Sequence, residues 1–468
     1  MKFQLRDFKK ISLVIWFLIG LILLKGGFSF FLRLAGEEKT LVKNVNPAVY
    51  ENAGSGDTTF VSPQTILSEK VKFKGDSWLP MTAASIFFEK YPKGPLYDSL
   101  LRNKTSKFIY PPSSVLLFYL PHRFMGVQYA SIAHGFDRIA SLCIFLIALL
   151  SATILLSVLK DPRFYQFKIS NPLETIVVYL LICYLTFRFF PITYAAEIGQ
   201  IQTELTLLGT LSLLFWQLDK KYISGILIGI ICLIKPQLGM LLLWGAIRKQ
   251  WKMVMGGLVV IIPCILVSIG LFGFKNHVEY LSVLSFLSHH GEAYYTNQSM
   301  NGLMNRFLFN GYNLYYSERF YPPYSPVVYA TTLIFALLVL LPALFWNYKS
   351  KNPGVTDMSI IILASIMVSP IAWEQHYGML LPIFISQIPF AIFYFKNKKW
   401  ALLLFILGFI LASRYILVVR QFADSRLNIL QSYLFFGAII ELMFLFWISY
   451  LERKSGEPLE TVTQVRKN

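Results

Sequence analysis

A few polar side chains could carry chemistry in a chain that is otherwise strongly apolar. Asp76 lies between Gly75 and Ser77, and a carboxylate in such a segment can act as a general base toward a hydroxyl group. Aspartate and serine are also favoured helix N-caps, so this residue pair could simply begin the helix that follows. Asp57, in Gly-Asp-Thr-Thr, is a second candidate for the base, although its surroundings are typical of a turn.

Lys235 is the strongest single signal, because apolar residues flank it on both sides. A lysine within a membrane segment costs about 2.5–3.5 kcal/mol on insertion scales. Pro236 follows it and removes a helix hydrogen-bond donor, so we expect Lys235 at a helix break, where its ammonium group could hold a phosphate. The alternative is that the side chain extends to a polar interface without a ligand.

The other candidates are amide, basic and aromatic side chains that suit sugar hydroxyls or a phosphate. They are Tyr110, Gln200, Gln202, Gln237, Asn297, Gln298, Arg306, Trp373 and His376. Structural roles compete with each assignment. Proline after Tyr110 can simply begin a helix, amides often join membrane helices to one another, and His376 could be a buried packing residue.

The elements that must position these residues are membrane helices. The chain has 468 residues, of which 55% are hydrophobic and 15% charged, and its mean hydropathy is +0.55. These values exclude a soluble globular protein and a disordered one. The apolar runs are continuous rather than alternating, so the predicted fold is all-α and not a β-barrel. A helix needs roughly 20 residues to cross a bilayer, so the length allows about ten to twelve transmembrane helices.

The predicted spans lie near 11–33, 137–159, 173–191, 203–218, 222–234, 237–247, 252–273, 326–346, 357–371, 378–395, 400–418 and 430–450. Basic residues in the short connections orient them, because cytoplasmic loops carry an excess of lysine and arginine. Both termini are then cytoplasmic, in the inner (plasma) membrane. The net charge of +18 is attributed to this topology and to anionic lipids, not to nucleic acid.

The stretch 222–251 decides the topology. As one long helix, it would invert the orientation of everything that follows. As two short arms that meet at Lys235-Pro236, it returns the basic residues from Arg248 onward to the cytoplasm, in agreement with the later loops. We therefore predict a broken hairpin.

A single transmembrane domain is expected over 1–450, with a cytoplasmic tail at 451–468. Two long segments, about 34–136 and 274–325, lie outside the membrane on the same side. Within the first, residues 78–90 and 111–124 are predicted to form short helices at the membrane interface. All polar clusters then fall on the extracytoplasmic side. The four cysteines lie inside apolar runs, so neither disulfides nor a zinc site is expected.

In order and spacing, these clusters resemble those of the GT-C class of polytopic glycosyltransferases, and most closely family 87, the polyprenyl-phosphate-mannose-dependent kind. The resemblance covers roughly residues 75–382. The series is Asp76, Gly94-Pro95-Leu96-Tyr97-Asp98, Phe108-Ile109-Tyr110-Pro111-Pro112, Leu120-Pro121, Gly199-Gln200-Ile201-Gln202, Ile234-Lys235-Pro236-Gln237, Asn297-Gln298-Ser299-Met300-Asn301-Gly302 and Ser369-Pro370-Ile371-Ala372-Trp373-Glu374-Gln375-His376-Tyr377.

The resemblance implies transfer of a sugar, mannose in the first place, from a polyprenyl-phosphate donor to a lipid or glycan acceptor at the extracytoplasmic face. One aspartate, Asp76, would deprotonate the acceptor in an inverting reaction without metal or cofactor. Lys235, with Arg306 or His376, would stabilise the departing phosphate. The acceptor stays open.

Two other classes compete with this interpretation. A transporter or flippase for a lipid-linked glycan would favour inverted repeats and broken helices at the membrane midplane, whereas this chain has one broken element and no second copy. An O-antigen-type polymerase or ligase shares a large outer loop, but would favour paired arginines there. Substitution of Asp76 should distinguish an enzyme from a transporter.

Overall fold

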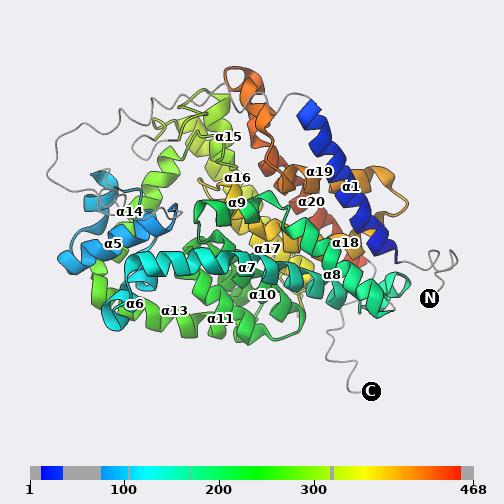
Figure 1. The fold of residues 1–468 in the computed structure, drawn as a ribbon, viewed down its shortest axis with the longest axis horizontal. Coiled ribbons are helices and arrows are strands. Elements are labelled where there is room, and N and C mark those ends of the chain that lie inside the picture. Colours follow the sequence, from blue (N-terminus) through cyan, green and yellow to red (C-terminus); the bar gives the residue numbers. More distant parts are fainter. Residues whose placement is uncertain are drawn as a thin grey trace.

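The computed structural model describes residues 12–34, 75–103, 106–169, 171–316, 321–350 and 352–454. Within these ranges the chain is a bundle of helices (Figure 1) and the only β-pairing is an isolated antiparallel bridge between Asn297 and Trp373. The predicted all-α class is confirmed. The alternative base Asp57 lies outside the described residues.

Six helices of the described ranges are long and apolar enough to cross a bilayer. They are α1 (Leu13–Leu34), α7 (Tyr129–Val158), α13 (Trp251–Phe272), α16 (Pro326–Phe345), α18 (Leu380–Phe395, extended by the 3-10 turn η6, Glu374–Met379) and α20 (Tyr433–Lys454, extended by η8, Arg426–Ser432). A seventh crossing is formed if α8 (Pro172–Thr186) and α9 (Phe190–Ile198) are taken together, with a bend of 56° between them.

The other predicted spans are shorter helices. They are α10 (Gln202–Gln217), α11 (Lys221–Cys232), η5 with α12 (Pro236–Gly239 and Met240–Ile247), α17 (Val355–Met367) and α19 (Lys399–Ser413). At 1.5 Å per residue, a helix of 16 residues is about 24 Å long and falls short of a hydrocarbon core of about 30 Å. Every predicted span thus coincides with a helix, but only six or seven satisfy the length for a complete crossing.

The hairpin predicted at Lys235-Pro236 is confirmed by helix packing. A Cβ atom on Gly225 would lie 1.9 Å from the Met253 carbonyl oxygen, and one on Gly229 would lie 2.7 Å from that of Gly257. Residue numbers therefore rise together along α11 and α13, which run parallel. Such close backbone approach requires glycine at the contact.

The second arm, α12, runs the opposite way. Leu242 packs beside Gly257, whereas Gly245, further along α12, lies beside Met253. The contacts pair later residues of α12 with earlier residues of α13, so the two helices are antiparallel. The chain therefore turns back at Lys235 and turns again before α13, as two short arms require.

The segments expected to share the cytoplasmic side meet at one end of the bundle. The hydrogen bonds there pair Lys221 with Gln250 (2.9 Å), Arg248 with the Leu344 carbonyl (2.6 Å), Trp346 with Ser449 (3.1 Å) and Arg163 with Glu452 (3.2 Å). We call this the basic end. That it faces the cytoplasm stays a prediction.

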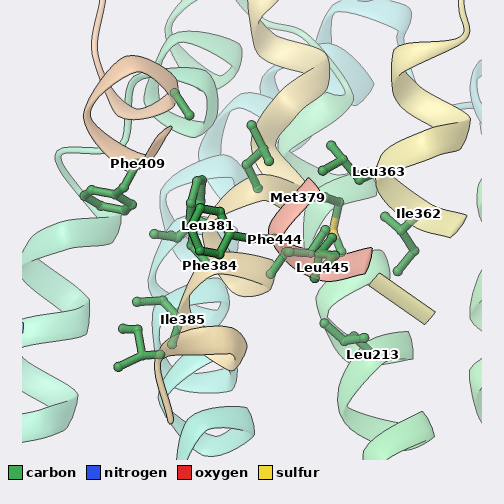
Figure 2. Close-up of a cluster of buried hydrophobic side chains, with 14 of the residues drawn as sticks. Leu213, Ile362, Leu363, Met379, Leu381, Phe384, Ile385, Phe409, Phe444 and Leu445 are labelled. Atoms are coloured by element: carbon green, nitrogen blue, oxygen red, sulfur yellow. The ribbon is translucent and has the colours of Figure 1, made fainter. Parts of the chain in front are cut away.

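The packed core surrounds α18. In its most apolar stretch 89% of the residues are buried, against 22% in the corresponding stretches of α13 and α16, which are therefore peripheral. Side chains from five helices and the η6 turn interlock there (Figure 2): Leu213 of α10, Ile362 and Leu363 of α17, Met379 of η6, Leu381, Phe384 and Ile385 of α18, Phe409 of α19, and Phe444 and Leu445 of α20. This core fixes η6, which carries His376.

Several helices lie outside the long spans. They are α5 (Trp78–Lys90), the π-helical turn η2 (Asp98–Arg102), η3 (Pro112–Val115), α6 (Leu116–Met125), α14 (Phe274–His290) and α15 (Met300–Phe307). The helices predicted at 78–90 and 111–124 are thus present. In Figure 1, α5 and α14 lie together on the side of the bundle away from α1, and Asn276 of α14 accepts the Leu96 N–H at 3.0 Å.

Candidate active site

The two residues before α5 are held by the turn between α9 and α10. The Asp76 N–H donates to the Ile198 carbonyl (3.1 Å), and the Ser77 N–H donates to the Gly199 carbonyl (3.1 Å). Gly199 ends α9 with a φ of +69°, a conformation that favours glycine. This pair of backbone hydrogen bonds brings Asp76 next to Gln200.

A hydrogen-bonded network surrounds the Asp76 carboxylate. Gln200 Nε2 donates to Asp76 Oδ2 (2.6 Å), and Gln200 Oε1 accepts from Ser77 Oγ (2.5 Å). The Tyr110 hydroxyl lies 2.9 Å from the same serine oxygen. Burial raises the pKa of Tyr110, and the Asp76 charge raises it further, so the phenol stays neutral. Ser77 makes no side-chain cap bond to α5, because its hydroxyl belongs to this network.

Lys235 lies in the break between the hairpin arms. Its φ of −128° is not helical, and η5 begins at the next residue, Pro236. The side chain is 7% exposed, and its Nζ lies 2.6 Å from His376 Nε2. An ammonium group can only donate, so this ring nitrogen accepts and the ring hydrogen of a neutral His376 resides on Nδ1. Burial lowers the pKa of Lys235 to about 7, while the charge of Asp76 opposes that shift.

The first loop contacts the tip of the hairpin directly. Ser113 Oγ, three residues after Tyr110, donates to the Leu233 carbonyl at 2.6 Å. Leu233 is two residues before Lys235. This contact joins the Asp76 network to the Lys235–His376 pair, so a base and a buried cation share one region of the molecule.

Trp373 belongs to a second buried cluster that adjoins this region. Its Nε1 donates to Glu292 Oε2 (2.9 Å), and Glu292 forms an ion pair with Lys107 (3.4 Å). The Lys107 ammonium lies 5.4 Å from the Trp373 ring centroid and 4.6 Å from that of Tyr316. The rings of Trp373 and His376 are 5.9 Å apart. Lys107 and Glu292 thus position a residue that contacts the lysine–histidine pair.

Asn297 connects the second loop to the segment before α18. Its Nδ2 donates to the carbonyls of Glu292 (2.9 Å) and Pro370 (3.1 Å), and its Oδ1 accepts the Ala372 N–H (3.0 Å). The side chain is fully buried. All three contacts are to the backbone, and they support the bridge to Trp373.

Gln298 and Arg306 are also directed into the protein. Gln298 Nε2 donates to the Gln431 carbonyl (2.7 Å). The Arg306 guanidinium donates to the Asn297 carbonyl (3.0 Å) and to Ser432 Oγ (2.6 Å). Both side chains are buried, and burial lowers the pKa of Arg306 to about 9. These contacts join the second loop to the start of α20.

A comparison with known protein families gives a match over much of the chain. The sequence model described as glycosyltransferase family 87 matches residues 108–370, more than half of the chain. The chain belongs to glycosyltransferase family 87. No curated protein and no solved structure matches it. It is therefore a membrane glycosyltransferase, with a sugar donor and an acceptor as substrates. Asp76 precedes the matched range and His376 follows it.

Five of the residues that we expected in the site of this glycosyltransferase come together. They are Asp76, Tyr110, Gln200, Lys235 and His376. Trp373 adjoins them through its ring, whereas Asn297, Gln298 and Arg306 form the adjacent framework.

The two remaining amides lie at the edges of this site. Gln202 begins α10 and is buried, and its Oε1 has no hydrogen-bond partner in the described part of the chain. Gln237 is half-buried on η5, two residues after Lys235. Neither takes part in the hydrogen bonds around Asp76 described above.

Sequence reasoning missed Lys107 and Glu292 in the family 87 chain. A charged residue before an aromatic run, and another after a pair of histidines, carry no local signal for burial. Their pairing joins segments 185 residues apart, and only the fold reveals it.

Proposed function

We propose that this glycosyltransferase transfers mannose from a polyprenyl-phosphate donor to a hydroxyl group of a lipid or glycan acceptor. The observation that carries the proposal is the joining of a hydrogen-bonded carboxylate, Asp76, to a buried cation, Lys235, at the tip of a membrane hairpin. A general base and a phosphate-binding cation are what a single displacement on a glycosyl phosphate needs.

In the proposed reaction, Asp76 takes the proton of the acceptor hydroxyl. The acceptor oxygen forms a bond to the anomeric carbon as the bond from that carbon to the phosphate oxygen breaks. The electron pair leaves with the polyprenyl phosphate, and the anomeric configuration inverts. Polyprenyl phosphate is a good leaving group, so departure requires no general acid.

Gln200 and Tyr110 prepare the base for this step. The Gln200 amide donates to one carboxylate oxygen and so orients the other. Gln200 is itself fixed by Ser77, which also contacts Tyr110. A base held in this way has little freedom to reorient, which favours reaction from the bound complex.

Lys235 would meet the phosphate of the donor. Its ammonium group is buried against His376, where little water can enter. In such a site the attraction between the ammonium group and a phosphate is stronger than in water. The polar clusters lie away from the basic end, which supports an extracytoplasmic site in the inner membrane with both termini in the cytoplasm.

The test is transfer of labelled mannose from polyprenyl-phosphate mannose by the purified full-length protein in nanodiscs. Asp76→Asn keeps the size and the hydrogen-bond acceptor for Gln200 but removes the base. We expect kcat to fall about 10²–10⁴-fold with unchanged thermal unfolding. Asp98→Asn is the matched control, because Asp98 is an exposed carboxylate of the same loop, paired with Arg102.

Equal turnover by Asp76→Asn and the wild type would remove Asp76 from the mechanism. Asp57→Asn would then be measured in the same assay. A wild-type protein that transfers no sugar to any lipid or glycan acceptor offered would contradict the choice of donor.

A further inference from the structure

A row of aromatic rings runs beside the Asp76 network, and the proposed reaction makes no use of it. Successive ring centroids lie 4.7–6.2 Å apart, within the range of direct ring contact. In order, the rings are Tyr194, Phe190, Tyr415, Tyr295, Tyr294, Tyr316 and Trp373. We call this set the aromatic row.

The two ends of the aromatic row lie at the two halves of the site. Tyr194 is one helical turn before Ile198, whose carbonyl holds the Asp76 N–H. Trp373, at the other end, contacts the ring of His376, the partner of Lys235. The row therefore passes from the base to the cation along a path separate from their direct connection.

Most of the row is not core. Phe190, Tyr194, Tyr294 and Tyr415 are half-buried, and Tyr316 is 39% exposed. The buried members support these. The Tyr295 hydroxyl lies 2.8 Å from that of Tyr415, and the Arg420 guanidinium lies over the Tyr295 ring at 5.3 Å. Because these contacts hold the accessible rings in place, a ligand can bind to them without a rearrangement of the protein.

The chemistry of the row favours a sugar over a lipid. Tyrosine offers an apolar face and a hydroxyl group at its edge, and a pyranose ring likewise has an apolar C–H face and hydroxyls at its rim. An acyl chain would pack equally well against leucine, the commonest of the exposed large hydrophobic residues. Five of the seven rings are tyrosines.

We propose that the aromatic row is the binding site for a saccharide acceptor, with Tyr194 under the sugar ring whose hydroxyl is presented to Asp76. This assignment rests on the proposed function, in which a sugar is transferred from the donor to the acceptor hydroxyl near Asp76. Of the lipid and glycan acceptors left open above, it selects a glycan. Tyr294, Tyr415 and Tyr316 extend the site away from the base toward further sugar units.

The experiment uses octyl α-mannoside as the acceptor probe and n-octanol as the control that lacks a sugar ring. Acceptor KM is measured with polyprenyl-phosphate mannose as donor, and equilibrium binding of labelled octyl mannoside is measured separately without donor. Both use full-length protein in nanodiscs. The variants are Tyr194→Leu, which removes the ring, and Tyr194→Phe, which keeps it. Tyr312→Leu is the control, because Tyr312 is 79% exposed and lies outside the row.

We expect Tyr194→Leu to raise the acceptor KM and the dissociation constant of octyl mannoside roughly five- to tenfold, the scale of one ring-stacking contact. Donor KM should stay unchanged, and Tyr194→Phe should retain most of the affinity. The wild type should bind octyl mannoside and not n-octanol. A merely structural role for Tyr194 would lower stability and both affinities together.

The aromatic row would lose its assignment if Tyr194→Leu bound octyl mannoside as the wild type does, or if n-octanol competed equally with the sugar. The binding measurement separates this inference from the proposed function. Wild-type protein that binds octyl mannoside through Tyr194 but transfers nothing to it supports the row and contradicts the donor chemistry.

Discussion

Two buried polar regions lie side by side in this protein, and they use similar residues in opposite ways. Around Asp76, side chains bond mainly to other side chains, as Gln200 does with Ser77. Around Asn297, the side chains bond mainly to backbone carbonyls, as Arg306 does with Asn297. Ser77, Gln200, Asn297 and Arg306 are buried, whereas Asp76 is half-buried.

The difference separates groups that can react from groups that hold the fold. A side chain that donates to backbone carbonyls provides hydrogen bonds that these buried carbonyls would otherwise lack. Moving that side chain would remove those hydrogen bonds and destabilise the fold. The Asp76 carboxylate, by contrast, accepts a hydrogen bond from the side-chain amide of Gln200. The first region is therefore expected to respond to substitution in turnover, and the second in stability.

After that of Asp76→Asn, the largest effect that would sharpen this contrast is expected at Lys235. Lys235→Met removes the charge and keeps an apolar stem of similar length, so kcat/KM should fall about 10²–10³-fold, the scale of losing one transition-state donor. The measurement is mannose transfer alongside thermal unfolding. Lys235→Arg keeps the charge and should recover part of the loss. A methionine variant that is unstable but fully active when folded would place Lys235 in the framework.

A smaller effect is expected at Gln200. Gln200→Leu removes the amide that orients Asp76, so kcat should fall about 10–100-fold while the dissociation constant of the donor stays unchanged. Gln217→Leu, at the far end of α10, is the matched control. Donor binding weakened in proportion to kcat would show that Gln200 acts on the donor and not on the base.

The pH dependence offers a test without substitution. Burial lowers the pKa of Lys235 to about 7 in the free protein, so the ammonium form prevails below pH 7 and is lost above it. The phosphodiester of the donor keeps its charge throughout. Donor KM should therefore rise up to about tenfold from pH 6 to pH 8. Lys235→Arg should flatten the profile, and a wild-type profile that is already flat would contradict the assignment.

The smallest effect on turnover is expected at Asn297. Asn297→Ala removes the acceptor of the Ala372 N–H and a donor to the Glu292 and Pro370 carbonyls, which costs about 1–3 kcal/mol of stability. The Pro370 carbonyl keeps its hydrogen bond from Ser299 Oγ. The folded fraction should keep kcat within about threefold of the wild type. Thermal unfolding and active-site-normalised turnover check both parts. A stable variant with greatly reduced kcat would move Asn297 from the framework into the site.

Sequence reasoning located the helices and the hairpin because these follow from local rules. A proline after a lysine in an apolar run predicts a break, and the basic residues from Arg248 onward require the chain to turn back there. The predicted span 173–191 ends at Pro191, whereas in the structure the chain bends by 56° there and continues as α9 to Ile198. The family was recognisable because its motifs are short and occur in order.

The partners of the site residues could not be predicted in this way. Asp76 and Gln200 are 124 residues apart, and Lys235 and His376 are 141 residues apart. The sequence indicated that these residues were unusual, but not which would meet. Asn297 and His376 looked equally suited to a ligand, and only their hydrogen bonds distinguish a framework amide from an acceptor for Lys235.

The attachment of α5 at Ile198 and Gly199 bears on how the chain can change over evolutionary time. Both contacts use backbone carbonyls, so they place no demand on the side chain at position 198. Gly199 has a positive φ, which favours glycine there. The base can thus keep its position while the neighbouring residues change. Distant relatives of this enzyme should therefore be easier to recognise from the geometry of this turn than from the amino-acid sequence around it.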